Sequence, residues 1–222
     1  MLDVGQFESV EDAVSKLDPG SRYLNIAELL FPLPPGGMPT NVQFYFWAAM
    51  ITRSEALQGA ISREAKASNP QATFVLLRTF LESLVMVMYV LDHPRYVGAL
   101  MDHPRNRAKD APRRRTMQSL LSHAAKYAPN IKEVYAELSE FAHFGSTALW
   151  TSHVPGERDE LGHLSVTWQT APSWRNDEQA YIACAHTLEL ADGMDFYLRE
   201  FTERYIVPLR KAPAAQTFAT DR

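Results

Sequence analysis

The spacing of apolar residues along this chain predicts helices over most of its length. The clearest stretch runs from Phe74 to Leu91, FVLLRTFLESLVMVMYVL, and only Arg78 and Glu82 interrupt it with charge. A separation of four residues places these two charges on one helix face. Because a helix that is apolar on all sides lies at the centre of a bundle, the pattern predicts a buried helix with an interior polar pair.

A second long helix is predicted immediately before this one. Thr40 and Gln43 stand at the spacing of a capping box, and apolar residues then recur at helical spacing to about residue 67. Asn69, followed by a proline, is typical of the start of a new helix. A joint as short as this requires the predicted helices 41–67 and 70–91 to pack antiparallel.

Prolines, glycines and asparagines mark the ends of the remaining helical segments. The segment PLPPGGMP, residues 32–39, predicts a stiff connector that breaks any helix entering it. Apolar spacing on either side of this connector predicts further helices over residues 7–17, 22–31, 95–102, 112–127, 129–143 and 176–206.

The periodicity changes from helical to alternating after Gly145. In residues 147–154 and in residues 164–168, two sets of side chains alternate at every second position. The segment between these runs, residues 155–160, is rich in turn-forming and charged residues. Two alternating runs on either side of such a segment predict a β-hairpin at about 147–170.

These elements together predict a mainly α fold, a helical bundle of four to five long helices with short N-terminal helices and one inserted β-hairpin. The predicted organisation has three parts along the chain. They are short helices with a proline-rich connector over 1–39, the helical bundle over 40–211, and a disordered tail over 212–222.

Composition narrows the class of protein. The chain has 222 residues, of which 46% are hydrophobic and 22% charged, as in an ordinary globular domain. Its single cysteine, Cys184, excludes an internal disulfide framework and a cysteine-rich zinc site. The histidines lack the spacing that places two metal ligands on one helix face, so we expect no metal and no cofactor.

The compartment is predicted from the N-terminus and from the apolar stretch. The N-terminus is acidic and lacks the basic and apolar regions of a signal peptide. The two charges inside the stretch 74–91 oppose a membrane span, since each would be costly in the middle of a bilayer. We therefore expect a cytoplasmic protein that does not cross a membrane.

Four polar residues are candidates for a site in the bundle. Arg78, Glu82, Tyr135 and His143 all lie on predicted helices. A histidine near a glutamate can act as a general acid–base pair, and an arginine can hold an anion. The same four groups can also simply satisfy one another, as buried polar groups must. The structural interpretation is favoured, because catalysis would need an open pocket.

A basic segment, residues 105–115, is the second candidate site. It reads RNRAKDAPRRR and holds six basic residues and one acid, in a chain whose formal net charge is −4. Three of its arginines fall in the first turn of the predicted helix 112–127, where they oppose the helix dipole. The segment predicts contact with nucleic acid or with an acidic protein surface, unless it only balances acids elsewhere. Its candidate anion-binding residues are Arg105, Arg107, Lys109, Arg113, Arg114 and Arg115.

The polar residues carry a resemblance to a known group. The Arg-x3-Glu spacing of Arg78 and Glu82, followed by Tyr135, Leu138 and His143 on a later helix, resembles a family of uncharacterised bacterial helical-bundle proteins. The resemblance covers about residues 41–210 and implies a helical bundle without implying an activity.

The outline of the fold is also similar to the HEPN superfamily of helical bundles. That resemblance implies a possible metal-independent ribonuclease with an Arg-x4–6-His motif on a helix. The corresponding string here runs from Arg158 to His163. It falls in the predicted hairpin rather than on a helix, and strings of this kind arise readily by chance.

Two functions from different classes follow from these observations. The first is a non-enzymatic module that acts by self-association, as a homo-oligomer, or by binding a partner. In that case Trp150, Trp168 and Trp174, in or near the hairpin, are natural contact residues. The second is a HEPN-like nucleic-acid-binding protein or ribonuclease that uses the basic segment.

Overall fold

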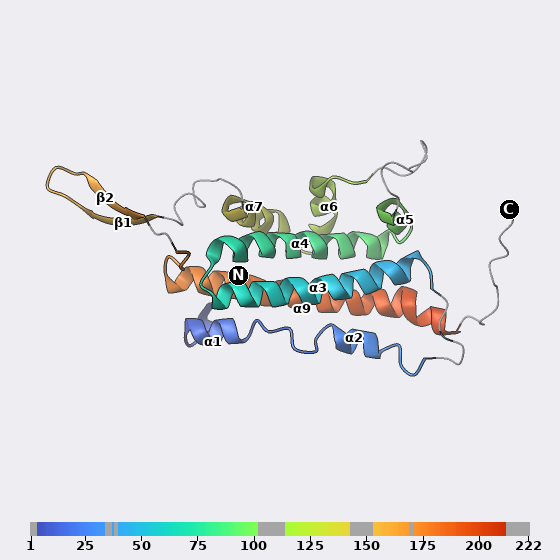
Figure 1. The fold of residues 1–222 in the computed structure, drawn as a ribbon. Helices are drawn as coiled ribbons and strands as arrows, with labels where there is room; N and C mark the ends of the chain where they lie inside the picture. Colours follow the sequence, from blue (N-terminus) through green and yellow to red (C-terminus); the bar gives the residue numbers. More distant parts are fainter. Residues whose placement is uncertain are drawn as a thin grey trace.

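The computed structural model describes residues 4–33, 37, 40–101, 114–142, 153–168 and 171–211. In this part of the chain the protein is a mainly helical bundle with one antiparallel β-hairpin between α7 and α9 (Figure 1). The bundle elements are α1 (Val10–Ser15), α2 (Leu24–Glu28), α3 (Val42–Lys66), α4 (Pro70–Asp92), α5 (Tyr96–Met101), α6 (Met117–Ala124), α7 (Ile131–Ala142) and α9 (Asp177–Phe201), and the hairpin strands are β1 (His153–Arg158) and β2 (Leu164–Trp168).

Short helical turns flank this bundle at both ends. A 3-10 turn, Val4–Gln6, precedes α1. Helix α9 does not stop at Phe201 but passes into a π-helical turn, Thr202–Ile206, and then into a 3-10 turn, Val207–Lys211. The predicted helical segment 176–206 is therefore continuous, although its last part is no longer an α-helix. The predicted tail, 212–222, lies outside the described residues.

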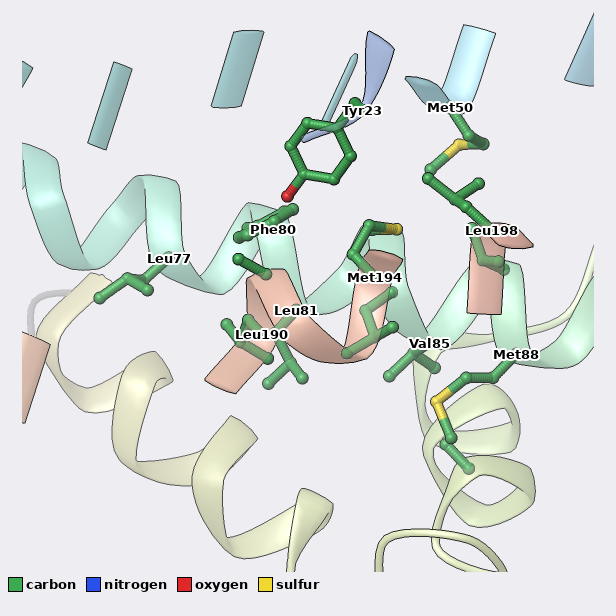
Figure 2. Packing of buried hydrophobic residues seen from close by; sticks show 14 of the residues in the cluster. Tyr23, Met50, Leu77, Phe80, Leu81, Val85, Met88, Leu190, Met194 and Leu198 are labelled. Atoms are coloured by element: carbon green, nitrogen blue, oxygen red, sulfur yellow. The ribbon is translucent and has the colours of Figure 1, made fainter. Parts of the chain in front are cut away.

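Helix α4 is the centre of the bundle, as its apolar sequence predicts. It packs against α3 and α9 on one side and against α6 and α7 on the other, while α1 and α2 lie beyond α3 and α9 (Figure 1). By length and composition α4 could cross a membrane, but 67% of its most apolar window is buried inside this fold, which is the arrangement of a core helix. Figure 2 shows side chains of its buried face together with those of α9, namely Leu77, Phe80, Leu81, Val85, Met88, Leu190, Met194 and Leu198.

Asparagine side chains begin the three long helices. Asn69 and Asn176 each accept a hydrogen bond from a backbone N–H in the first turn, which confirms the predicted starts of α4 and α9. The capping box predicted at Thr40 is wrong. Asn41 has the extended backbone of an N-cap, and its Oδ1 accepts the N–H of Phe44 at 3.0 Å, so the helix begins one residue later.

Buried hydrogen bonds attach the ends of the chain to the bundle. The hydroxyl of Tyr23 donates to Oε1 of Gln58 at 2.8 Å, and the amide of Gln58 donates to the carbonyl of Leu17 at 2.9 Å. The indole of Trp47 donates to Oγ1 of Thr202 at 2.7 Å. Because buried polar groups are costly unless paired, these bonds fix how the N-terminal helices and the end of α9 sit on α3.

Helix α6 begins later than the sequence pattern predicts. Its N-cap is Thr116, and Arg114 and Arg115 precede that cap with non-helical backbone. The prediction that these arginines lie in the first turn of a helix is therefore wrong. The apolar pattern from Met117 onward needs only the shorter helix, and a threonine is a better cap than the residues before it. Residues 102–113 lie outside the described part of the chain.

The hairpin is confirmed, but its turn lies later in the chain than the sequence predicts. Strand β1 begins at His153 and runs through Pro155, which had been assigned to the turn, while the predicted strand residues 147–152 lie outside the described residues. The turn forms where the carboxylate of Asp159 accepts backbone N–H groups further along, and Gly162 there has φ +82°. That local hydrogen bonding, rather than the proline, decides where the chain reverses.

Candidate anion-binding site

Three of the four polar residues predicted to meet do so, between α4 and α7. Nη2 of Arg78 donates to the hydroxyl of Tyr135 at 2.8 Å, and that hydroxyl donates to Oε1 of Glu82 at 3.2 Å. The Arg78 guanidinium also lies 3.3 Å from Glu82 and 5.1 Å from the centre of the Tyr135 ring. We call these residues the polar triad. The fourth candidate, His143, lies outside the described residues.

The polar triad is only partly buried, so the pair is less interior than the sequence predicts. The side chains of Arg78 and Glu82 are 20% and 33% exposed. Both side chains contact Tyr135 of α7 and remain partly open to solvent. The Tyr135 hydroxyl both accepts from Arg78 and donates to Glu82, so it links the two charged groups.

A second polar cluster, absent from the sequence predictions, forms at the last turn of α4. Oδ2 of Asp92 accepts the hydroxyl of Tyr127 at 2.5 Å and lies 2.9 Å from Nε2 of His123. Burial acts to raise the pKa of Asp92, but the hydrogen bonds from Tyr127 and His123 outweigh it and lower that pKa. Asp92 is more than 30 positions from both His123 and Tyr127 in the sequence, so no spacing within one helix could have revealed the cluster.

Aromatic packing holds His123 at this position. Its ring centre lies 5.1 Å from that of Tyr89 and 5.2 Å from that of His93, both of which come from the end of α4. The hydrogen bond to Asp92 raises the pKa of Tyr127, which keeps that phenol protonated as a donor. The cluster is therefore a fixed wall between α4 and α6.

A concave site with a volume of about 670 Å³ opens beside this wall. We call it the basic pocket. Three arginines converge on it, and no carboxylate belongs to its lining within the described part of the chain. Its lining residues are Tyr89, His93, Arg95, Tyr96, Arg114, Arg115, Thr116 and Ser119.

The residues just before α6 are held in the pocket by contacts with both ends of α5. Nη2 of Arg114 donates to the carbonyl of Leu100 at 3.0 Å, and the backbone N–H of Arg115 donates to the Tyr96 hydroxyl at 2.6 Å. Arg114 thereby satisfies a carbonyl at the C-terminus of α5, where a cation is favoured. The guanidinium groups of Arg95 and Arg115 form no hydrogen bond to any residue that the structure describes, so their donors are available to a ligand.

Two of the six predicted anion-binding residues can thus be placed, and both line the basic pocket. They are Arg114 and Arg115. The other four, Arg105, Arg107, Lys109 and Arg113, lie outside the described residues. Sequence reasoning missed Arg95 and His93, because nothing in the local pattern indicates that the turn after α4 faces the start of α6.

The Arg158–His163 string lies at the turn of the hairpin. Nη1 of Arg158 donates to the carbonyl of Gly162 at 3.0 Å, and Nδ1 of His163 lies 3.0 Å from a carboxylate oxygen of Asp159. Both side chains are exposed and bind within the turn itself. This arrangement is a solvated turn in which each group serves the local geometry.

Metal-binding residue types do not gather in the described ranges. No group of three or more histidine, cysteine, aspartate or glutamate side chains there has a geometry suited to a metal ion. The histidine–carboxylate contacts at His123 and His163 each involve one carboxylate. The basic pocket therefore offers hydrogen-bond donors and positive charge as its chemistry.

No protein-family model, curated protein or solved structure matches the chain. The function has to be argued from the geometry itself.

Proposed function

We propose that the chain is a non-enzymatic binding module that takes an acidic protein segment into the basic pocket. The observation that carries this proposal is the convergence of Arg95, Arg114 and Arg115 on one concave site whose described lining contains no carboxylate. Like charges placed together repel one another, and an anionic partner relieves that repulsion. Arginine also binds carboxylates with two parallel hydrogen bonds, which suits a protein partner.

An acidic protein segment fits the pocket better than an extended nucleic acid does. The two tyrosines in the lining, Tyr89 and Tyr96, are only 8% and 7% exposed, so their rings offer little surface for base stacking. The chain as a whole carries a formal charge of −4, which repels a long polyanion outside the pocket. A short loop with one or two carboxylates meets neither difficulty.

A second copy of the chain carries such a loop. The hairpin extends away from the bundle, at the opposite end of α4 from α5 (Figure 1), and Glu157 and Glu160 are exposed beside its turn. Every residue of β2 is exposed, and Trp168 is 71% exposed. An isolated two-stranded hairpin is marginal in water and gains stability when it is covered. Two antiparallel copies could each place a hairpin turn at the other's basic pocket, which closes a dimer.

The three tryptophans proposed as contacts differ in position. Trp168 is available on the hairpin, whereas Trp174 packs edge-on against Phe74 of the bundle. Trp150 lies outside the described residues. We therefore assign the hydrophobic part of the contact to Trp168, Leu164 and Val166. These three residues are spaced two apart, so they lie on the same face of β2.

The oligomeric state tests the proposal. Light scattering at micromolar concentrations and low salt should give a dimer for the wild type. The double variant Arg95→Gln/Arg115→Gln should give a monomer, because it removes the two available guanidiniums. Arg63→Gln/Arg175→Gln removes two exposed arginines outside the pocket and should leave the dimer intact. A wild type that remains monomeric at every concentration would reject self-association.

A charge exchange tests the direct contact. Arg95→Glu/Arg115→Glu and Glu157→Arg/Glu160→Arg should each fail to self-associate. Mixed together, the two variants should associate, since both contacts of the mixed dimer pair a basic with an acidic surface. Dimers that persist in each separate variant would show that another surface holds the copies together.

The second candidate is a HEPN-like nucleic-acid-binding protein or metal-independent ribonuclease. It is favoured by His93 in the pocket lining, next to the His123–Asp92 pair, since the arginines would hold a phosphate while a histidine moves a proton. Incubation with mixed RNA in EDTA tests it. Cleavage that is lost in His93→Ala would support the enzyme, with His143→Ala and His163→Ala testing the other histidines. Absence of both binding in a gel shift and cleavage would reject it.

A further inference from the structure

A second, apolar cavity lies between α4, α7 and α9. Its volume is about 200 Å³, and we call it the apolar pocket. Two of its wall residues, Leu81 and Leu190, are seen close together in Figure 2. Its apolar wall consists mainly of Leu81, Leu84, Met88, Ile131, Val134 and Leu190.

One of the residues lining this pocket is a buried histidine. His186 lines the pocket and is only 3% exposed, and its Nε2 has no hydrogen-bond partner in the part of the chain that the structure describes. The nearest carboxylate oxygen, Oε2 of Glu137, is 3.9 Å away, which is beyond hydrogen-bond reach.

The charge state of His186 follows from its surroundings. Burial lowers the pKa of the ring, although the carboxylates of Glu137 and Glu189 act in the opposite direction. The ring is therefore neutral at pH 7, and the contact with Glu137 is not an ion pair. A neutral imidazole without a partner reduces the stability of the fold, and a leucine at this position would remove that loss.

We propose that the apolar pocket binds a small uncharged hydroxyl compound of about the size of phenol, whose hydroxyl group hydrogen-bonds to Nε2 of His186. The size follows from the volume, because an apolar cavity of about 150 Å³ holds benzene. A pocket of about 200 Å³ has room for the ring and one substituent. A hydroxyl group both donates and accepts, so it fits either tautomer of the imidazole.

The surrounding charges exclude the other common head groups. An anionic head would be repelled by Glu137 and by Glu189, which lies on the rim of the pocket. A cationic head beside His186 would lose its hydration against an apolar wall. An uncharged hydroxyl group avoids both costs.

Phenol and toluene are the probes that test this inference, because they match in shape and differ in the hydroxyl group. In calorimetric titration of the wild type, phenol should bind about tenfold more tightly than toluene, as one ordinary hydrogen bond allows. His186→Leu should bind toluene more tightly than phenol, because the phenol hydroxyl would then be buried without a hydrogen-bond partner. The matched control His93→Leu replaces an exposed histidine outside the pocket and should keep the preference for phenol.

Three further measurements separate binding at this pocket from general effects of substitution. The imidazole nitrogen resonances of His186 should shift when phenol is added to the wild type and should not shift with toluene. Val134→Phe places a larger ring in the pocket wall and should abolish binding of both probes. Arg95→Gln/Arg115→Gln should bind phenol like the wild type, so this result does not depend on the basic pocket. Equal affinity of the wild type for both probes, or a preference for phenol that survives in His186→Leu, would overturn the proposal.

Discussion

Helix α4 carries one polar cluster near its middle and another at its last turn, and their surroundings differ. In the polar triad, Arg78 and Glu82 meet through the hydroxyl of Tyr135, which serves both. At the last turn, the Asp92–His123 pair backs a wall of the basic pocket, where arginine donors remain available. The more conspicuous pair in the sequence is thus linked by a tyrosine. The basic pocket instead combines Arg114 and Arg115 of the basic segment with Arg95, which no sequence pattern indicated.

The largest effect is expected at the last turn of α4. Asp92→Ala should lower the free energy of unfolding by about 2 kcal/mol, because it leaves His123 buried with an unpaired ring nitrogen. Urea denaturation measures the change, with Asp177→Ala at the exposed start of α9 as a control of small effect. An unchanged midpoint would show that His123 is satisfied without Asp92, and the contrast between the two clusters would weaken.

His186, in the apolar pocket, differs from both clusters because its Nε2 has no hydrogen-bond partner among the described residues. His186→Leu should raise the free energy of unfolding by about 1 kcal/mol, because it removes a buried unpaired nitrogen and adds apolar contact. Thermal denaturation without added ligand measures this. Destabilisation by the same substitution would indicate that the imidazole is paired within the fold.

His186 should also make the free energy of unfolding depend on pH. The pKa of His186 is lowered in the folded state, so between that value and the ordinary value of 6.5 the unfolded chain binds more protons. The free energy of unfolding should therefore fall as the pH drops through 6.5 and level off below the folded pKa. His186→Leu should remove this part of the pH dependence, and a parallel profile in wild type and variant would contradict the assignment.

A smaller effect is expected at the polar triad. Glu82→Ala should lower the free energy of unfolding by about 1 kcal/mol, because Arg78 and Tyr135 can rehydrate in their half-exposed seam. Glu133→Ala, an exposed glutamate on α7, is the matched control. A loss of about 3–5 kcal/mol would mean that the pair is interior after all, as the sequence pattern alone predicts.

The smallest change in the free energy of unfolding is expected at acid pH, where Asp92 becomes protonated. The folded pKa of Asp92 is lowered, so its contribution is present above the unfolded value of about 3.9 and is lost as the pH falls through the folded value. Acid denaturation of the wild type should therefore show this loss below about pH 4. Asp92→Asn should flatten that part of the profile, and identical profiles would show that the hydrogen bonds to Asp92 do not favour its charged form.

Short-range physics explains what could be predicted from the sequence. Asn69 and Asn176 begin helices because their side chains bond to backbone groups three residues away. The stretch that became α4 is central because an apolar surface on all sides has to be buried. The meeting of Arg78 with Tyr135 was within reach as well, since each was the conspicuous polar residue of a helix otherwise directed to the core.

What only the tertiary structure decided depends on packing between distant segments. The docking of α6 against the end of α4 brings His123 to Asp92 and Arg115 to the basic pocket. The packing of α7 and α9 determines that Arg78 reaches solvent and that His186 does not. Helical periodicity identifies which residues share a face of one helix, but the exposure and the partners of that face are set by which other helix covers it.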